Sequence, residues 1–173
     1  MDQVLFDFVS AACKLHNWPL STVTKHHWWR DMGVSDDDFW QPIHDAGITF
    51  WANLDSFPWT RELLAYVDNQ FRLKDGNCWT ICTSPSRCPD SRIGKLASLH
   101  SQGIMPPIPV LFSSEKEKYA TEDTILIDDN EEVIRRFRAA GGKGIVFPTP
   151  YNEHGDYSSD PVAFIKIMVE NVS

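Results

Sequence analysis

Thr124-Ile125-Leu126-Ile127-Asp128-Asp129-Asn130 is the stretch that decides the fold of this chain. Its aliphatic run predicts a short buried strand, and the acidic pair followed by Asn130 predicts a helix that starts directly after it. On both sides of this stretch, short apolar runs alternate with helical periodicity. The pattern predicts further strands at 78–82, 108–112 and 144–147, and helices at 90–102, 131–140 and 160–172. Strands that alternate with helices predict an α/β fold with a mostly parallel sheet and helices on both faces.

Residues 17–74 interrupt this alternation of strand and helix patterns. The segment has no strand signal and carries most of the tryptophans, so it predicts a helical insertion placed after a first helix that ends near His16. The expected organisation is a core made of residues 1–16 and 75–173, with a small helical cap at 17–74.

The helix expected at 90–102 carries apolar residues at three-residue spacing. Ile93, Leu96 and Leu99 are therefore expected to form its buried face, and Gly103 follows its end.

The composition restricts the partners and the compartment. The chain has 173 residues, with 16 Lys and Arg against 24 Asp and Glu, so its formal net charge is −8. This balance argues against a nucleic-acid polymer, which needs a dense basic face, but a local cation still permits a small anionic ligand. No apolar run reaches the ~20 residues of a membrane span. Four cysteines without a dense framework predict reduced thiols and a cytoplasmic protein, and their spacing does not suit zinc. Monomer and homodimer both remain open.

The polar residues that follow the predicted strands share the chemistry of magnesium-assisted phosphoryl transfer. Ligands of parallel α/β sheets gather at the carboxyl ends of the strands. Carboxylates there can hold a hard cation, while hydroxyls and an ammonium can bind phosphate oxygens. The candidates are Asp2, Thr83, Ser84, Lys116, Lys118, Asp128 and Asp129.

Each candidate also has a simple structural interpretation. Asp128 and Asp129 can be a strand-end turn with a helix cap, and either lysine can be a solvated surface charge. The aromatic residues of the insertion, among them Phe50 and Trp51, can be its core. The order of the set along the chain, acid, hydroxyl, lysine and acid pair, favours a site.

These motifs resemble the haloacid-dehalogenase (HAD) superfamily, and within it the 5′(3′)-deoxyribonucleotidase-like phosphatases of bacteria and phages. Residues 2–8, Asp-Gln-Val-Leu-Phe-Asp-Phe, are similar to the first motif of the family, DGVLADF. Cys82-Thr83-Ser84-Pro85 is similar to the second motif and Leu126-Ile127-Asp128-Asp129 to the fourth. The resemblance covers nearly the whole chain. It implies a HAD-like Rossmannoid parallel sheet with a small helical cap, and a magnesium-dependent 5′-nucleotidase acting on small phosphomonoesters.

The resemblance also implies a role for each residue. Thr83 and Ser84 would bind the transferring phosphoryl group and Lys116 would neutralise it, whereas Lys118 matches the family less well. Asp128, supported by Asp129, would hold Mg²⁺. Asp2 would be the general acid and base, with its carbonyl also on the metal. The residues expected beside the base or sugar are Phe50 and Trp51.

One departure concerns the nucleophile. In the family, a nucleophilic aspartate lies two residues before the general acid, at the end of a central buried strand. That position falls directly ahead of Met1, and Gln3 replaces the usual glycine. We expect either that the printed sequence starts after the nucleophile, which is favoured, or that the protein is a non-catalytic binder of nucleotide or phosphate. Without the strand, two strand edges are expected to be exposed. A HAD phosphatase for a non-nucleotide phosphate, such as a sugar phosphate, is a further alternative.

Overall fold

The computed structural model describes residues 1–73, 76–77 and 79–172, and these form a mixed α/β fold that is 51% helical. The helices are α1 (Phe8–His16), α2 (Asp36–Ala52), α3 (Thr60–Gln70), α4 (Asp90–Ser101), α5 (Glu131–Ala139) and α6 (Pro161–Val172). The strands are β1 (Arg72–Leu73), β2 (Gly76–Asn77), β3 (Cys82–Thr83), β4 (Leu111–Phe112), β5 (Ile125–Asp128) and β6 (Lys143–Val146). Short 3₁₀ turns are η1 (Leu20–Thr22), η2 (Trp28–Arg30), η3 (Lys116–Tyr119) and η4 (Gly155–Tyr157).

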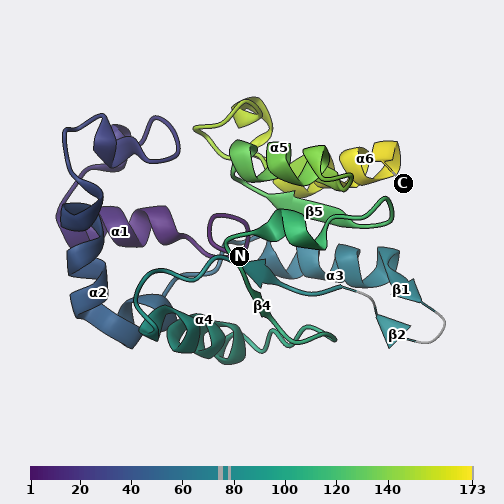
Figure 1. The fold of residues 1–173 in the computed structure, drawn as a ribbon, viewed down its shortest axis with the longest axis horizontal. Coiled ribbons are helices and arrows are strands. Elements are labelled where there is room, and N and C mark those ends of the chain that lie inside the picture. The colour runs from purple at the N-terminus through teal and green to yellow at the C-terminus, as the bar shows by residue number, and fades with distance from the viewer. Residues whose placement is uncertain (74–75, 78, 173) are drawn as a thin grey trace.

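The strands of the core form two separate parallel pairs. β3 pairs with β4, and β5 pairs with β6 over four residues each. Within the described ranges no strand joins the two pairs, so the single parallel sheet that the sequence predicts is split in two. The amino terminus lies between the pairs, with β5 on one side and β4 on the other (Figure 1).

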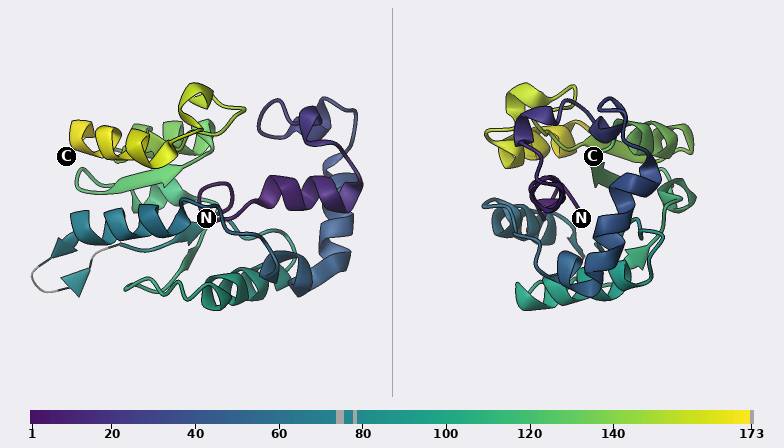
Figure 2. Two further views of the ribbon diagram at one scale, coloured as in Figure 1. Left: turned by 180° about the vertical axis from the view of Figure 1, so that it is seen from behind. Right: turned by 90° about the vertical axis from the view of Figure 1, so that its left-hand side faces the viewer.

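The helices are arranged around these pairs in two groups. α1, α2 and the turn η2 gather at one end of the molecule, as both views from opposite sides show (Figures 1 and 2). α3 lies beside the strand pairs and packs against α6. The sequence predicts residues 60–70 as part of the cap, whereas in the structure this helix lies beside the strand pairs. Cys78, part of the predicted strand at 78–82, lies outside the described residues.

Local sequence signals explain where several helices begin. The Asn130 side chain accepts hydrogen bonds from the main-chain N–H groups of Glu132 (3.0 Å) and Val133 (3.2 Å) and so caps α5. Asp160 caps α6 in the same way through the N–H of Ala163. None of the helices in the described part of the chain is both long and apolar enough to cross a membrane.

The buried face of α4 differs from the prediction. Ile93 is 55% exposed and Leu96 is 46% exposed, so of the three predicted residues only Leu99 is buried. The residues that face inward are mostly small or polar: Ser91, Gly94, Lys95, Ser98 and Leu99. The reason is the close approach of α2, which the small residues permit.

Gly94 is the point of closest approach between α4 and α2. A Cβ at this position would lie 2.5 Å from Trp51 Cβ and 2.7 Å from the carbonyl oxygen of Ile48. We expect Gly94→Ala to lower the free energy of unfolding by about 1–3 kcal/mol, because the two helices would have to separate. Leu96→Ala on the exposed face of the same helix is the control. Equal chemical-denaturation midpoints for the two variants would contradict this packing.

Candidate active site

A pocket of about 430 Å³ lies at the carboxyl ends of β3 and β5, and residues of the cap line part of it. Seven of the predicted site residues line it: Asp2, Trp51, Thr83, Ser84, Lys116, Asp128 and Asp129. Phe50 is not among the lining residues and packs instead against Phe8 and Trp51. Lys118 is exposed and pairs with Glu115 at 2.6 Å. The structure therefore brings together residues that are far apart in the sequence, and it separates Lys116 from Lys118.

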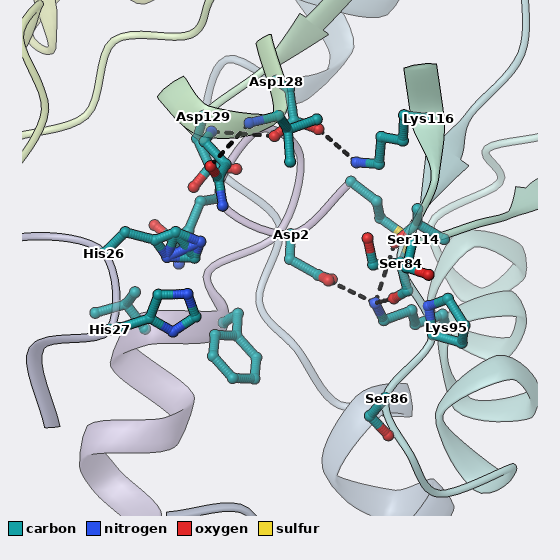
Figure 3. Close-up of a pocket in the computed structure, with 18 of the residues that line it drawn as sticks. Asp2, His26, His27, Ser84, Ser86, Lys95, Ser114, Lys116, Asp128 and Asp129 are labelled. Atoms are coloured by element: carbon teal, nitrogen blue, oxygen red, sulfur yellow. Dashed lines mark hydrogen bonds and ion pairs between the residues drawn. The ribbon is translucent and has the colours of Figure 1, made fainter. Parts of the chain in front are cut away.

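Lys116 and Asp128 form a buried ion pair at one side of the pocket (Figure 3). The Lys116 ammonium donates to one carboxylate oxygen of Asp128, and the other oxygen accepts the main-chain N–H of Asn130 at 3.0 Å. Burial lowers the pKa of Lys116, but the charge and hydrogen bond of Asp128 outweigh it and raise this pKa above its usual range. Lys116 is therefore a fixed positive charge at the end of β5.

Lys95 is a second buried lysine in the pocket, and it is not among the residues that the sequence predicts there. Its side chain is 1% exposed, and its ammonium donates to Asp2 Oδ2 at 2.5 Å, to Thr83 Oγ1 at 3.0 Å and to the carbonyl of Ser84 at 2.7 Å. It also lies 4.7 Å from the ring centre of Trp51. One cation thus connects the start of the chain, the loop after β3 and the cap.

A sequence signal for Lys95 exists, although it is weak. Ser91, Gly94 and Ser98 lie three, four and seven residues apart, which marks a face of small residues, and Lys95 lies on the same face. Ile93 and Leu96, the apolar residues on the opposite side of the helix, instead predict that side as the buried face. Burial of a lysine is rare unless it is paired, which makes Lys95 informative in the structure.

Three carboxylates converge on the same end of the pocket as the lysines. Desolvation, followed by the charge of Asp128, raises the pKa of Asp129 to about 7. Asp2 Oδ1 is buried and has no hydrogen-bond partner, while its other oxygen is held by Lys95. Crowded carboxylates with an unpaired buried oxygen are typical of a site that binds a cation or takes up a proton.

The other end of the pocket is formed by aromatic side chains from the cap and from α1. His26 and His27 stack on each other, and in Figure 3 they lie on the left of the pocket, below Asp129. Burial and the neighbouring His27 lower the pKa of His26 to about 4, so this imidazole is neutral at pH 7. The indole of Trp28 is 98% buried, and neither its Nε1 nor His27 Nδ1 has a hydrogen-bond partner. The other aromatic rings that line the pocket are Phe8, Trp29, Trp40 and Trp51, together with Tyr151 from the segment after β6.

The pocket therefore combines a charged end with an aromatic end. The charged end can bind an anion through the Lys116 ammonium and a hydroxyl, while the three donors of Lys95 are taken by Asp2, Thr83 and Ser84. The aromatic end can cover a flat or apolar group. Neither a scan against protein-family models nor a search of the curated proteins finds a match for this chain.

Proposed function

We propose that this chain forms the site of a magnesium-dependent phosphohydrolase of the 5′-nucleotidase type, which removes phosphate from nucleoside or deoxynucleoside monophosphates. The fold proposed for it is HAD-like, with a Rossmannoid core and a small helical cap. The observation that carries the proposal is a pocket in which Thr83, Lys116 and Asp128 line the same space as a set of aromatic rings.

The charged end supports binding of a phosphomonoester. Thr83 is the last residue of β3, Ser84 is the first residue of the loop after it, and Lys116 begins the turn η3. All three line the pocket, so hydroxyl and ammonium groups face one space. Lys116 would neutralise the phosphoryl group as its charge redistributes during transfer. Lys95 would hold Thr83 and Asp2 in place.

Mg²⁺ is the metal that this proposal requires, and the oxygen donors present suit it. In the described part of the chain no three His, Cys, Asp or Glu side chains form a ready-made metal group. Mg²⁺ does not require one, because it keeps several waters and is usually held by one or two carboxylates and the substrate phosphate. Asp128, supported by Asp129 and the carbonyl of Asp2, would hold the ion, which would add positive charge next to the phosphate.

Asp2 is proposed as the general acid and base. Asp2 lines the pocket, its Oδ1 has no hydrogen-bond partner, and the ion pair with Lys95 fixes the other oxygen. It would protonate the leaving nucleoside oxygen and then deprotonate the attacking water. The adjacent Gln3 has a φ of 58°, the left-handed conformation that favours glycine, which agrees with the glycine that the family has at this position.

The aromatic wall favours a nucleotide over a sugar phosphate. A nucleobase has a flat face that can stack on tryptophan or histidine rings, and the unpaired Nε1 of Trp28 can donate to an acceptor on the ligand. A non-catalytic binder of nucleotide or phosphate remains the second candidate, because every residue named above except Asp2 serves binding.

Phosphate binding tests the charged end directly. We expect Lys116→Ala to weaken the binding of inorganic phosphate or vanadate, measured calorimetrically in the presence of Mg²⁺, by about 1–3 kcal/mol, because a charged hydrogen bond is lost. Lys118→Ala is a matched control, since this lysine lies two residues away and is exposed. Equal affinities for the two variants would contradict the proposal. Tighter binding of a hexose phosphate than of a deoxynucleoside monophosphate would assign the site to sugar phosphates.

A further inference from the structure

The segment after β6 contacts both stretches of chain that carry the carboxylates of the candidate active site, residues 2–3 and residues 128–129. It comprises residues 147–154 and, apart from the exposed Pro150 and Glu153, it is buried or half-buried. We call this segment the β6 loop. Two of its side chains, Tyr151 and Asn152, make the contacts.

The side chain of Asn152 makes four hydrogen bonds, which is the full capacity of an amide. Its oxygen accepts the N–H groups of Thr149 (3.2 Å) and His154 (3.1 Å) within the β6 loop. Its nitrogen donates to the carbonyls of Phe147 (2.8 Å) and Asp129 (3.3 Å). One half of the amide therefore shapes the loop, and the other half attaches the loop to the turn after β5.

This attachment matters because the two acidic residues of the turn are held in different ways. The carboxylate of Asp128 is held directly by Lys116, and its carbonyl accepts the N–H of Phe147 at 2.8 Å. Within the described residues, the carboxylate of Asp129 has no hydrogen-bond partner. The direction of the Asp129 side chain therefore depends on its main chain, which Asn152 holds.

The neighbouring Tyr151 attaches the same loop to residues 2–3. Its hydroxyl oxygen lies 2.8 Å from the amide of Gln3 and is hydrogen-bonded to it. With its amide nitrogen toward Tyr151, Gln3 also accepts the N–H groups of Phe8 (3.0 Å) and Val9 (2.7 Å) through its oxygen. Gln3 has a φ of 58°, and a left-handed residue other than glycine persists only where its surroundings determine its conformation. Tyr151 is one of these surroundings, and Asp2 directly precedes the residue that it holds.

We propose that Tyr151 and Asn152 are positioning residues for the magnesium site: they fix the turn of Asp129 relative to the main chain of Asp2. The inference rests on the proposed function, in which Asp129 and the carbonyl of Asp2 lie around the ion. Mg²⁺ demands near-ideal octahedral geometry, so small displacements of its oxygen donors reduce affinity. Tyr151 and Asn152 act through the groups that they hold, as residues that orient metal ligands do.

The first measurement needs no metal. Asn152→Asp keeps an oxygen for the two N–H groups of the β6 loop but has no donor for the carbonyl of Asp129. That carbonyl and the N–H of Asn130 belong to the same peptide group, so releasing the one loosens the other. We expect amide hydrogen exchange at Asn130 to accelerate by about tenfold or more in this variant. Exchange at Lys143, which is bonded to Thr124 before the other end of β5, should not change.

The second measurement is the affinity for Mg²⁺, determined calorimetrically in the presence of inorganic phosphate. Tyr151→Phe keeps the ring and removes only the hydroxyl, and we expect it to weaken Mg²⁺ binding by about tenfold. Tyr157→Phe is the matched control, because this tyrosine is 55% exposed and lies on η4 in the same connection to α6.

Asn152→Asp provides a result of opposite sign. Its added negative charge alone would tighten Mg²⁺ binding, whereas displacement of Asp129 weakens it, and we expect binding to be weaker by about tenfold. Asn171→Asp, on the exposed side of α6, carries the same added charge and measures the effect of charge by itself.

Two results would overturn the proposal: unchanged exchange at Asn130 in Asn152→Asp, or native or tighter Mg²⁺ binding in both Tyr151→Phe and Asn152→Asp. Absence of Mg²⁺ binding by the unaltered chain is a different result, which would contradict the proposed function. Exchange at Asn130 would still show whether Asn152 fixes the turn of the acidic pair.

Discussion

A polypeptide of the 173 printed residues is expected to hydrolyse deoxynucleoside monophosphates very slowly or not at all. The same polypeptide preceded by an apolar strand that ends in Asp directly before Met1 is expected to gain magnesium-dependent turnover, by about 10³-fold or more. This prediction rests on the proposed function, in which an aspartate directly before Met1 is the nucleophile. The measurement is release of inorganic phosphate from a deoxynucleoside monophosphate.

The proposed mechanism explains the size of the effect. A carboxylate attacks phosphorus, the bond to the nucleoside oxygen breaks, and Asp2 gives its proton to the leaving oxygen. Water, deprotonated by Asp2, then attacks the aspartyl phosphate and releases inorganic phosphate. In this mechanism, general acid and base catalysis by Asp2 would contribute ~10²–10⁴-fold, and Lys116 and Thr83 would add electrostatic stabilisation. None of these residues supplies the nucleophile.

Matched variants separate the nucleophile from the strand. An added strand that ends in Asn in place of Asp should stabilise the fold without restoring turnover, and Asp2→Asn should abolish the turnover of the active form. Robust turnover by the polypeptide of 173 residues alone would contradict the mechanism, provided that it survives repurification and is lost on Asp128→Asn. Another residue would then be the nucleophile.

The sequence predicts an element correctly where the spacing of its apolar residues and a helix-capping residue indicate the same boundary. The run from Thr124 to Asn130 predicts both a strand and a capped helix, and β5 and α5 occupy these positions. α4 is different, because its apolar residues mark the wrong face: Ile93 and Leu96 are exposed. Sequence period cannot show that α2 approaches so closely that only Gly94 and small neighbours fit, and this contact determines which face is buried.

In the candidate site, too, a sequence rule locates some residues, whereas others are located only by the packing of the folded chain. Strand-end position predicts that Thr83, Lys116 and Asp128 share a pocket, since carboxyl ends of parallel strands lie at one edge, and the structure places them together. Lys95 lies in the middle of a helix, where no such rule applies. Phe50 and Trp51 are adjacent in the sequence, but only Trp51 lines the pocket, because neighbouring helical residues face different directions.

Loss of the buried cation of Lys95 is expected to have the largest effect on stability. Lys95→Met should lower the free energy of unfolding by about 3 kcal/mol, because Asp2 would keep a charge without its partner. The value is at the low end for a buried pair because the Asp2 side chain is 26% exposed. Thr83 and the carbonyl of Ser84 would also lose a donor. Chemical denaturation, with the exposed Lys118→Met as control, measures the difference.

A double-mutant cycle shows whether the ion pair is the cause. Removing both charges, in Lys95→Met with Asp2→Asn, should restore part of the lost stability, because no unpaired charge then remains at the pocket. If the losses of the two single variants simply add, Lys95 stabilises the fold by packing against Trp51 rather than by pairing with Asp2. Lys95→Arg should not substitute for lysine, since the larger planar guanidinium does not fit the space from which one compact ammonium reaches Asp2, Thr83 and Ser84.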